Sequence, residues 1–343
     1  MRGVHRALGF RAGLRAVRGP RWLCHFIRAN APGVPRGDGL GLLRDAHSRT
    51  GGAIVPLSVL VVGAGPGGVA AAVQLHRLGA RVRWWDRTGV IGGLLRNARS
   101  VENWPGMPVG VSGAECCVRL RDHAAAFGLF PEKVEATEFC ESGTAVEVAR
   151  AGGVTEQVDA VVWAMGTRPQ PWAMARPELP VFYEFRDLPT AARRVLIVGG
   201  GEAACDGALH WMQSGGQAVL AVRSACLRAR GGLAGQTLGR AGLDLRFDTE
   251  VIGLASDGTG VCATLRTAAG AITEPFDAVL FCGGRTSRLP ELGFTTPPHG
   301  NLRLSPRTWV IGDARLGSLG QACIAMGDGL LAASEISELI RWG

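Results

Sequence analysis

The stretch LSVLVVGAGPGG, at Leu57–Gly68, decides the fold because it joins a buried strand to a helix through a glycine-rich turn. In a Gly-x-Gly-x-x-Gly turn the first glycine allows the tight bend, the second lets the backbone approach a pyrophosphate, and the third lets helix and strand pack closely. The helix N-terminus presents free N–H groups and the positive end of its dipole to the phosphates. This first glycine motif therefore predicts a βα unit that binds a dinucleotide through Gly63, Gly65, Pro66, Gly67 and Gly68.

A second stretch of the same kind, VLIVGGGEAA, lies at Val195–Ala204. In this second glycine motif Gly199, Gly201 and Ala204 take the three glycine positions, and Glu202 opens the expected helix. Two such motifs, each between a strand and a helix, indicate two dinucleotides that face one another. The predicted fold class is α/β, with two Rossmann-like three-layer dinucleotide-binding domains.

The basic charge of the chain is concentrated at its N-terminus. The formal net charge is +8, and residues 1–50 contain ten arginines and two aspartates, so they account for the whole excess. The remaining residues are neutral overall, which gives nucleic-acid binding no electrostatic support. We therefore expect no nucleic-acid partner.

Residues 1–55 are predicted to be a basic, disordered extension, and three interpretations stay open. The arginines fit a mitochondrial or plastid-type transit peptide, but Ser48 and Thr50 are the only hydroxyls in residues 1–50 and Pro20 interrupts the helix early. The extension could instead be a basic arm for an acidic partner, or translation could start near Val55. We expect a cytoplasmic protein, with organellar import if the transit peptide is real.

Membrane and metal sites are not expected. The apolar stretch Ala53–Leu75 contains the first glycine motif at its middle, which fits a βα turn and not a membrane span. The nine cysteines include no C-x-x-C pair and no metal-ligand spacing. They are interpreted as small apolar residues of a reduced protein, and no metal is predicted.

An acidic residue supports the first glycine motif. The strand expected after its helix ends RVRWWDR, and Asp86 lies about 20 positions past the glycines, where an acid binds the ribose hydroxyls of a dinucleotide.

Four further segments carry a resemblance to a known family. They are Gly92–Leu95 (GGLL) followed by Val101–Gly106 (VENWPG), then Ala164–Thr167 (AMGT), and finally Gly312-Asp313 with Gln321 and Ala325–Gly329. In order, they resemble the GGQL and VENYPG flavin-contacting segments, the ATG crossover and the C-terminal FAD motif of thioredoxin reductases. The resemblance covers about residues 57–343. It implies a discontinuous FAD-binding domain (56–168 and 285–343), an inserted NAD(P)H-binding domain (169–284), and a homodimer.

The resemblance also implies site residues for FAD. Asp86 would bind the adenosine ribose, and Asp313 would accept from a flavin-chain hydroxyl or order a water. The helix near Gln321 would point its N-terminus at the isoalloxazine. Trp104 would either wall the ring or belong to the ordinary core. The full FAD set is Gly63, Gly65, Pro66, Gly67, Gly68, Asp86, Gly93, Leu94, Asn103, Trp104, Gly166, Gly312, Asp313, Gln321 and Ala322.

NADPH is the expected nicotinamide cofactor, and NADH is the alternative. NADPH-preferring members of the family read His-Arg-Arg-x-x-x-Arg after the second motif. Here Arg223 and Arg228 match, while Val222 and Ser224 replace the other two residues. Two guanidinium groups can still clamp a 2′-phosphate. The NADPH set is Gly199, Gly201, Glu202, Ala204, Arg223 and Arg228.

The chain departs from thioredoxin reductases just before the second motif. Those enzymes carry a C-x-x-C pair there, whereas Pro180–Pro189 reads PVFYEFRDLP. This segment more closely resembles ferredoxin–NADP reductases of the same scaffold, although their C-terminal extension is not evident. We expect an enzyme that passes electrons from NADPH through FAD to a ferredoxin, a flavodoxin, a quinone or another small molecule. A disulfide reductase that uses partner cysteines and a non-turnover flavin sensor stay as alternatives. No catalytic residue is named.

Overall fold

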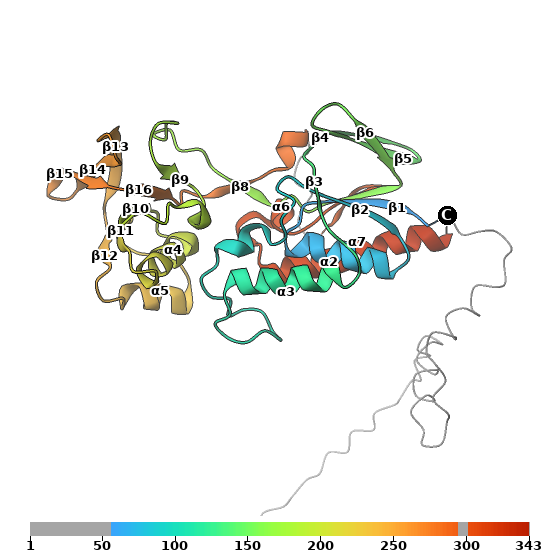
Figure 1. Cartoon of the computed structure of the whole chain (residues 1–343), viewed down its shortest axis with the longest axis horizontal. Helices are drawn as coiled ribbons and strands as arrows, with labels where there is room; N and C mark the ends of the chain where they lie inside the picture. The colour runs from blue at the N-terminus through green and yellow to red at the C-terminus, as the bar shows by residue number, and fades with distance from the viewer. Residues whose placement is uncertain (1–55, 294–300, 343) are drawn as a thin grey trace, which may run out of the picture. The chain divides into compact units, whose positions relative to one another are not determined.

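The computed structural model describes residues 56–293 and 301–342. The predicted N-terminal extension, residues 1–55, lies outside this part. Two mainly parallel sheets organise the described residues (Figure 1). Because the strands of one sheet lie on both sides of the other in sequence, one unit is inserted into the other.

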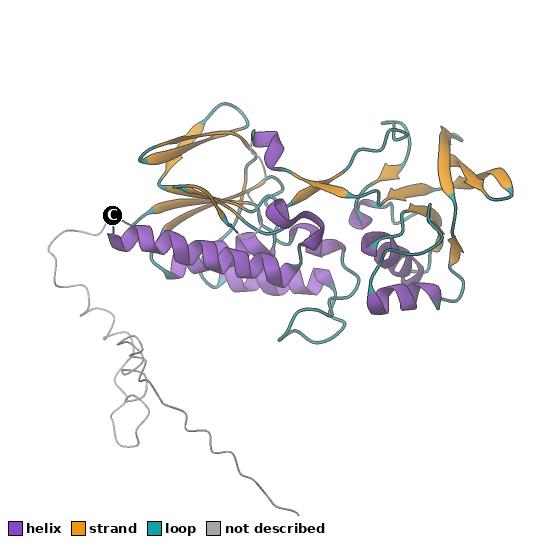
Figure 2. Cartoon of the chain, turned by 180° about the vertical axis from the view of Figure 1, so that it is seen from behind, coloured by secondary structure: helices purple, strands orange, loops and turns teal. Residues whose placement is uncertain are grey.

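The first sheet has six strands, with β1 at its centre paired in parallel with β2 and β7. Helices cover one face, and an antiparallel meander covers the other (Figures 1 and 2). In order across the sheet, the strands are β18 (Arg303–Ser305), β19 (Thr308–Val310), β7 (Ala160–Trp163), β1 (Ser58–Val62), β2 (Arg81–Asp86) and β3 (Glu132–Lys133). The covering elements are α2 (Pro66–Arg77), α3 (Gly113–Ala125), α7 (Ala322–Trp342), β4 (Ala136–Ser142), β5 (Ala145–Arg150) and β6 (Thr155–Val158).

The second sheet repeats this plan with five strands. Helices α4 (Glu202–Gln213) and α5 (Gly231–Leu238) pack on one face and a second meander packs on the other. The strands, in order, are β12 (Asp244–Arg246), β11 (Gln217–Ala221), β10 (Arg194–Val198), β16 (Ala278–Phe281) and β9 (Val181–Phe182). The meander is β13 (Glu250–Ser256), β14 (Val261–Thr267) and β15 (Gly270–Phe276).

Strand periodicity explains why each sheet has two cores. Successive side chains of a strand point to opposite faces. In β1, Val59 and Val61 join the helix-side core, whereas Leu60 packs with the meander. In β10, Ile197 packs with the helices and Leu196 with the meander. The apolar runs before both glycine motifs are therefore buried on both faces, and the predicted three-layer α/β fold is confirmed.

Two short strands lie on the chain segments that run between the two large sheets, and they form a small sheet of their own. β8 (Thr167–Pro169) pairs antiparallel with β17 (Arg285–Ser287). They lie at the domain limits expected from the sequence, which stay a prediction. The remaining short elements are η2 (Gly93–Asn97), η3 (Phe185–Asp187), η4 (Leu289–Leu292), α6 (Asp313–Leu316) and η5 (Gly317–Leu319).

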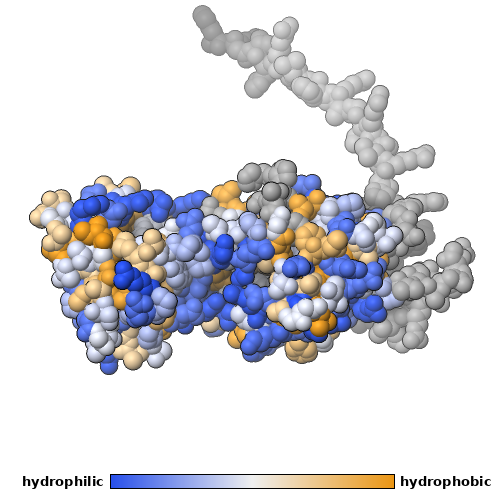
Figure 3. Space-filling view, turned by 90° about the horizontal axis from the view of Figure 1, so that it is seen from above, coloured by the Kyte–Doolittle hydropathy of each residue, from blue (hydrophilic) through white to orange (hydrophobic). Residues whose placement is uncertain are grey.

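In the described part of the chain, no helix is both long and apolar enough to cross a membrane. The molecular face in Figure 3 is mainly hydrophilic, with hydrophobic residues in separate groups.

Candidate functional site

One cavity of about 1050 Å³ reaches both glycine motifs. Gly63–Gly67 line it at the C-terminal end of β1, and Glu202 lines it at the start of α4. In open α/β sheets ligands bind at the carboxyl ends of the strands, where this cavity lies. Thirteen predicted site residues line it: Gly63, Gly65, Pro66, Gly67, Asp86, Gly93, Leu94, Gly166, Glu202, Gly312, Asp313, Gln321 and Ala322.

The glycines of the first motif have different physical roles. Gly63 has φ of +113°, and a Cβ there would lie 2.2 Å from the Ala164 carbonyl oxygen. A Cβ on Gly68 would lie 1.9 Å from the Gly63 carbonyl oxygen. A Cβ on Gly65, by contrast, meets no atom within 4 Å. Gly63 and Gly68 therefore allow the turn to close, and Gly65 leaves open space on the cavity side. The turn thus has the shape that a dinucleotide pyrophosphate needs.

Strand β2 holds this turn in place. The Trp84 indole N–H donates to the Gly63 carbonyl oxygen at 3.0 Å, and Asp86 Oδ2 accepts from the Ala64 N–H at 3.0 Å. Asp86 Oδ1 accepts from the Thr88 N–H and hydroxyl at 2.7 and 2.6 Å. The carboxylate is therefore fixed by its own chain at the cavity edge. Sequence reasoning missed Trp84 because an indole at an apolar strand position looks like core.

The C-terminal motif adds two carboxylates, the partly buried Asp313 and the buried Asp328. Asp313 lines the cavity, and burial raises the pKa of its carboxyl, opposed by the positive charge of Arg285. Asp328 accepts from the Gly312 N–H at 2.9 Å and forms an ion pair with Arg315 at 3.0 Å. Asp328 thus fixes the turn that presents Asp313.

Three predicted FAD residues lie outside the cavity lining. Gly68 lies behind the turn, where it packs against Gly63. Asn103 and Trp104 belong to the VENWPG segment, and neither lines the cavity. Trp104 packs, partly buried, against the apolar cluster that contains Val101 and Cys116. This placement matches the interpretation of Trp104 as ordinary core, and the FAD roles of these residues stay predictions.

The second glycine motif is built like the first. Gly199 has φ of +139°, and a Cβ there would lie 2.8 Å from the Cys282 carbonyl oxygen. A Cβ on Gly201 meets no atom within 4 Å. The loop after β11 is anchored to this turn, since the Arg228 N–H donates to the Gly200 carbonyl oxygen at 2.6 Å. Apart from Glu202, the predicted NADPH residues lie outside the lining of the large cavity.

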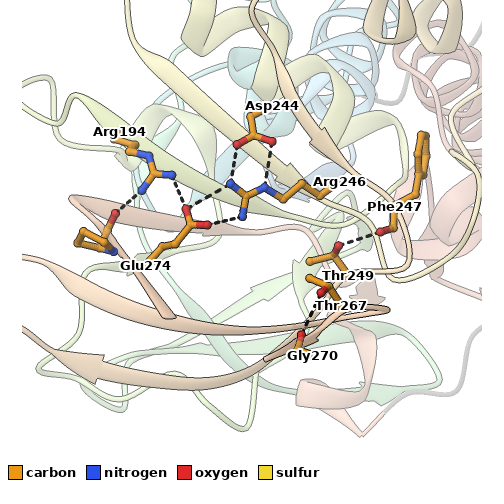
Figure 4. Close-up of polar contacts among 9 residues, drawn as sticks. Arg194, Asp244, Arg246, Phe247, Thr249, Thr267, Gly270 and Glu274 are labelled. Carbon is orange, nitrogen blue, oxygen red and sulfur yellow. Dashed lines mark hydrogen bonds and ion pairs between the residues drawn. The ribbon is translucent and has the colours of Figure 1, made fainter. Parts of the chain in front are cut away.

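The arginines of this loop are available for an anion. Arg223, Arg228 and Arg230 are exposed, and within the described residues none of their side chains forms a hydrogen bond or ion pair. Arg246, at the end of β12, is different (Figure 4). Its guanidinium binds Asp244 at 2.6 Å and Glu274 at 2.7 Å, and these contacts raise its pKa. A 2′-phosphate would therefore meet the loop arginines and not Arg246.

The segment between β9 and β10 contributes polar and aromatic groups to the cavity, and no cysteine is among the cavity's described lining residues. Glu184 accepts from Arg285 Nη1 at 2.8 Å and from Asn97 Nδ2 at 2.6 Å. Phe185 stacks on His210, with ring centroids 4.0 Å apart. Sequence reasoning missed Asn97, Glu184 and Arg285, because isolated polar residues far apart in sequence form no motif.

Of the thiols near the second sheet, Cys205 is buried, Cys262 and Cys282 are partly buried, and Cys226 is exposed. Burial raises the pKa of Cys205, and it raises that of Cys282 to about 12. Thiolates, not thiols, are the nucleophiles in disulfide exchange, so these groups are poorly reactive at neutral pH.

Comparisons with known proteins agree with this architecture. The chain is 25% identical to NADPH-dependent thioredoxin reductase 3 of Arabidopsis thaliana, over 84% of this chain and 59% of the relative. It is 23% identical to a Chlamydia trachomatis thioredoxin reductase, over 82% and 98%. The Streptomyces coelicolor thioredoxin reductase is covered over 64% of its length. The chain thus spans about 60% of the length of two of these relatives.

Solved structures show the same fold. A Lactococcus lactis thioredoxin reductase (FR conformation) matches with a TM-score of 0.75 and 20% identity, over 83% of this chain and 99% of that one. A bacillithiol disulfide reductase from Staphylococcus aureus matches with a TM-score of 0.68 and 14% identity, over 82% and 98%. The family model for pyridine nucleotide-disulphide oxidoreductases matches residues 57–329. The resemblance to thioredoxin reductases, whose family binds FAD and NADPH, is confirmed, and the chain belongs to the pyridine nucleotide-disulphide oxidoreductase family.

Proposed function

We propose that this protein is an FAD-dependent NADPH oxidoreductase that passes electrons from the flavin directly to an external acceptor. The observation that carries the proposal is the large cavity, which extends from the first glycine motif to Glu202 of the second and has no cysteine among its described lining residues. A family member without a dithiol beside the flavin has no internal group to relay electrons to a disulfide. The acceptor is a ferredoxin- or flavodoxin-type protein or a small molecule.

The chain contributes binding and orientation to this reaction. When bound, FAD supplies the two-electron acceptor for the hydride of NADPH and then releases electrons singly or in pairs. Each turnover oxidises one NADPH to NADP⁺, releases one proton and delivers two electrons to the acceptor. Gly65 and Gly201 leave room for the two pyrophosphates, and the free loop arginines favour the 2′-phosphate of NADPH. Hydride transfer then depends on proximity and orientation.

A disulfide reductase is the second candidate, because the similar proteins named above are thioredoxin and bacillithiol disulfide reductases. In this alternative a partner protein supplies the reactive cysteines. The buried Cys205 and the partly buried Cys282, with their raised pKa values, are unsuited to the task. A flavin-binding sensor that does not turn over is the third candidate.

Anaerobic mixing with NADPH separates these functions. Loss of the visible absorption band of oxidised flavin, followed by its return on addition of a ferredoxin, flavodoxin or quinone, supports our proposal. NADPH-dependent reduction of thioredoxin by the purified protein alone contradicts it. Failure of NADPH to bleach the flavin favours the sensor.

We also propose a homodimer in the cytoplasm, or in an organelle if the basic N-terminus is a transit peptide. Light scattering on the full chain tests the dimer, and fluorescence microscopy of a C-terminal fusion tests the location.

A further inference from the structure

A three-residue segment, Asn97–Arg99, joins the elements of the two sheets. It begins at Asn97, the last residue of η2, and the preceding residues of η2, Gly93–Arg96, line the large cavity. The Arg99 backbone N–H donates to Asp206 Oδ2 at 2.9 Å, and its guanidinium Nε lies 3.3 Å from Asp206 Oδ1. Arg99 Nη2 also donates to Gln236 at 2.9 Å. Its partners are therefore on α4 and α5, the two helices of the second sheet.

A second contact supports the same segment. Asn97 donates to Glu184 at 2.6 Å and accepts from the Arg186 N–H at 3.4 Å. Both partners lie between β9 and β10 of the second sheet. Arg186 Nη1 in turn donates to the Gly93 carbonyl oxygen at 3.0 Å. The segment thus contacts the elements around the second sheet at two places: helices α4 and α5 through Arg99, and the β9–β10 segment through Asn97.

The Arg99–Asp206 contact is better protected than a surface ion pair. The side chains are only 20% and 21% exposed, so water and salt screen them less than an exposed pair. The carboxylate also accepts a backbone N–H, which fixes its orientation. Loss of Arg99 would leave Asp206 as a largely buried charge without its cation, which is costly.

The position of Asp206 on α4 gives the contact a functional meaning. It lies one helical turn beyond Glu202, at the end of α4 that the second glycine motif presents to the cavity. A constraint on Asp206 therefore constrains the helix end expected to bind the NADPH pyrophosphate. The other end of the constraint is the segment that lines the cavity beside the first glycine motif.

We propose that Arg99, acting through Asp206, is a positioning residue for hydride transfer: it fixes the NADPH-binding helix end relative to the flavin site. The inference rests on the proposed function. Reacting atoms in such a step must lie about 3–3.5 Å apart, and a displacement of about 1 Å can cost about 100-fold in rate. A contact that fixes the distance between the two binding sites should therefore change the rate of flavin reduction by NADPH. It should not change the rate at which reduced flavin reacts with its acceptor.

Stopped-flow kinetics on the full-length, FAD-loaded protein test the proposal. In Arg99→Ala and Asp206→Asn, we expect bleaching of the flavin by saturating NADPH to slow by about tenfold to about 100-fold. Reoxidation of dithionite-reduced flavin by an added quinone should keep its wild-type rate. Arg121→Ala is the matched control, because among the described residues Arg121 pairs only with Asp122, on the exposed surface of α3.

Two further measurements separate positioning from a general loss of structure. Amide hydrogen exchange of the FAD-free protein should quicken in α4 of both variants and keep its wild-type rate in α2 and α7 of the first sheet. Because the two residues act as one contact, Arg99→Ala/Asp206→Asn should be no slower than the slower single variant.

Wild-type bleaching rates in both single variants, or additive effects in the double variant, overturn the positioning role and leave the proposed function intact. If NADPH does not bleach the wild-type flavin, the proposed function fails and the positioning role fails with it.

Discussion

Gly65 in the first motif and Gly201 in the second each face open space, and replacing either with alanine tests one predicted dinucleotide site without disturbing the other. Gly65 has φ of −70° and ψ of 177°, and Gly201 has φ of −90° and ψ of −178°, conformations that alanine adopts without strain. A Cβ at either position meets no protein atom within 4 Å. Alanine restricts the unfolded chain, which stabilises, but it is a poorer helix N-cap than glycine, which destabilises. The free energy of unfolding of the cofactor-free protein should therefore change by less than about 1 kcal/mol.

Cofactor affinity should change much more. The added methyl in Gly65→Ala lies where the FAD pyrophosphate approaches the backbone. Moving the phosphates away loses at least one hydrogen bond to a charged group, which is worth about 1.5–3 kcal/mol. Since about 1.4 kcal/mol corresponds to a tenfold change in Kd, FAD should bind about tenfold to about 100-fold more weakly. Gly201→Ala should weaken NADPH binding by a similar factor.

The assay is a titration of FAD-free protein with FAD, followed by flavin fluorescence, with thermal unfolding of the same samples. Gly201→Ala is the control: it should bind FAD as the wild type does and bind NADPH more weakly. Wild-type FAD affinity in Gly65→Ala, with unchanged stability, would show that no pyrophosphate approaches Gly65 and would refute the assignment of the first motif.

Other predictions concern stability. Gly68→Ala places a Cβ 1.9 Å from the Gly63 carbonyl oxygen. The free energy of unfolding of the FAD-free protein should therefore fall by about 1–3 kcal/mol or more. An unchanged melting temperature would contradict this packing. Ser112→Ala removes the capping box of α3 and should cost about 1 kcal/mol in urea unfolding, whereas no shift in midpoint would show that the cap is dispensable. Hydrogen bonds from Arg246 lower the pKa of Glu274, so its ionised form stabilises the fold above its ordinary pKa, and this contribution disappears as pH falls through the lowered value. Glu274→Gln should therefore weaken the fold at neutral pH and flatten its acid dependence, and an acid profile parallel to that of the wild type would argue against the network in Figure 4.

The sequence alone predicted those parts of the site that depend on local backbone geometry. The glycine positions of both motifs follow from what a strand–turn–helix unit requires, and the structure shows why: Gly63 and Gly68 admit no side chain, and Gly65 faces open space. Asp86 was predicted from its distance to the glycines along the chain, which a βαβ unit fixes. The buried apolar runs before the turns predicted the sheets.

Only the tertiary structure decided which distant polar residues meet. Arg99 contacts Asp206, and Glu184 contacts Arg285, across more than a hundred residues of sequence. Such contacts follow from how two sheets and their helices pack, and they impose no spacing that a single sequence reveals. Trp104 lies in a segment typical of flavin contact and packs, partly buried, against the cluster of Val101 and Cys116. Local motifs thus predicted two dinucleotide sites, whereas packing decided which distant side chains lie in contact between the elements of the two sheets.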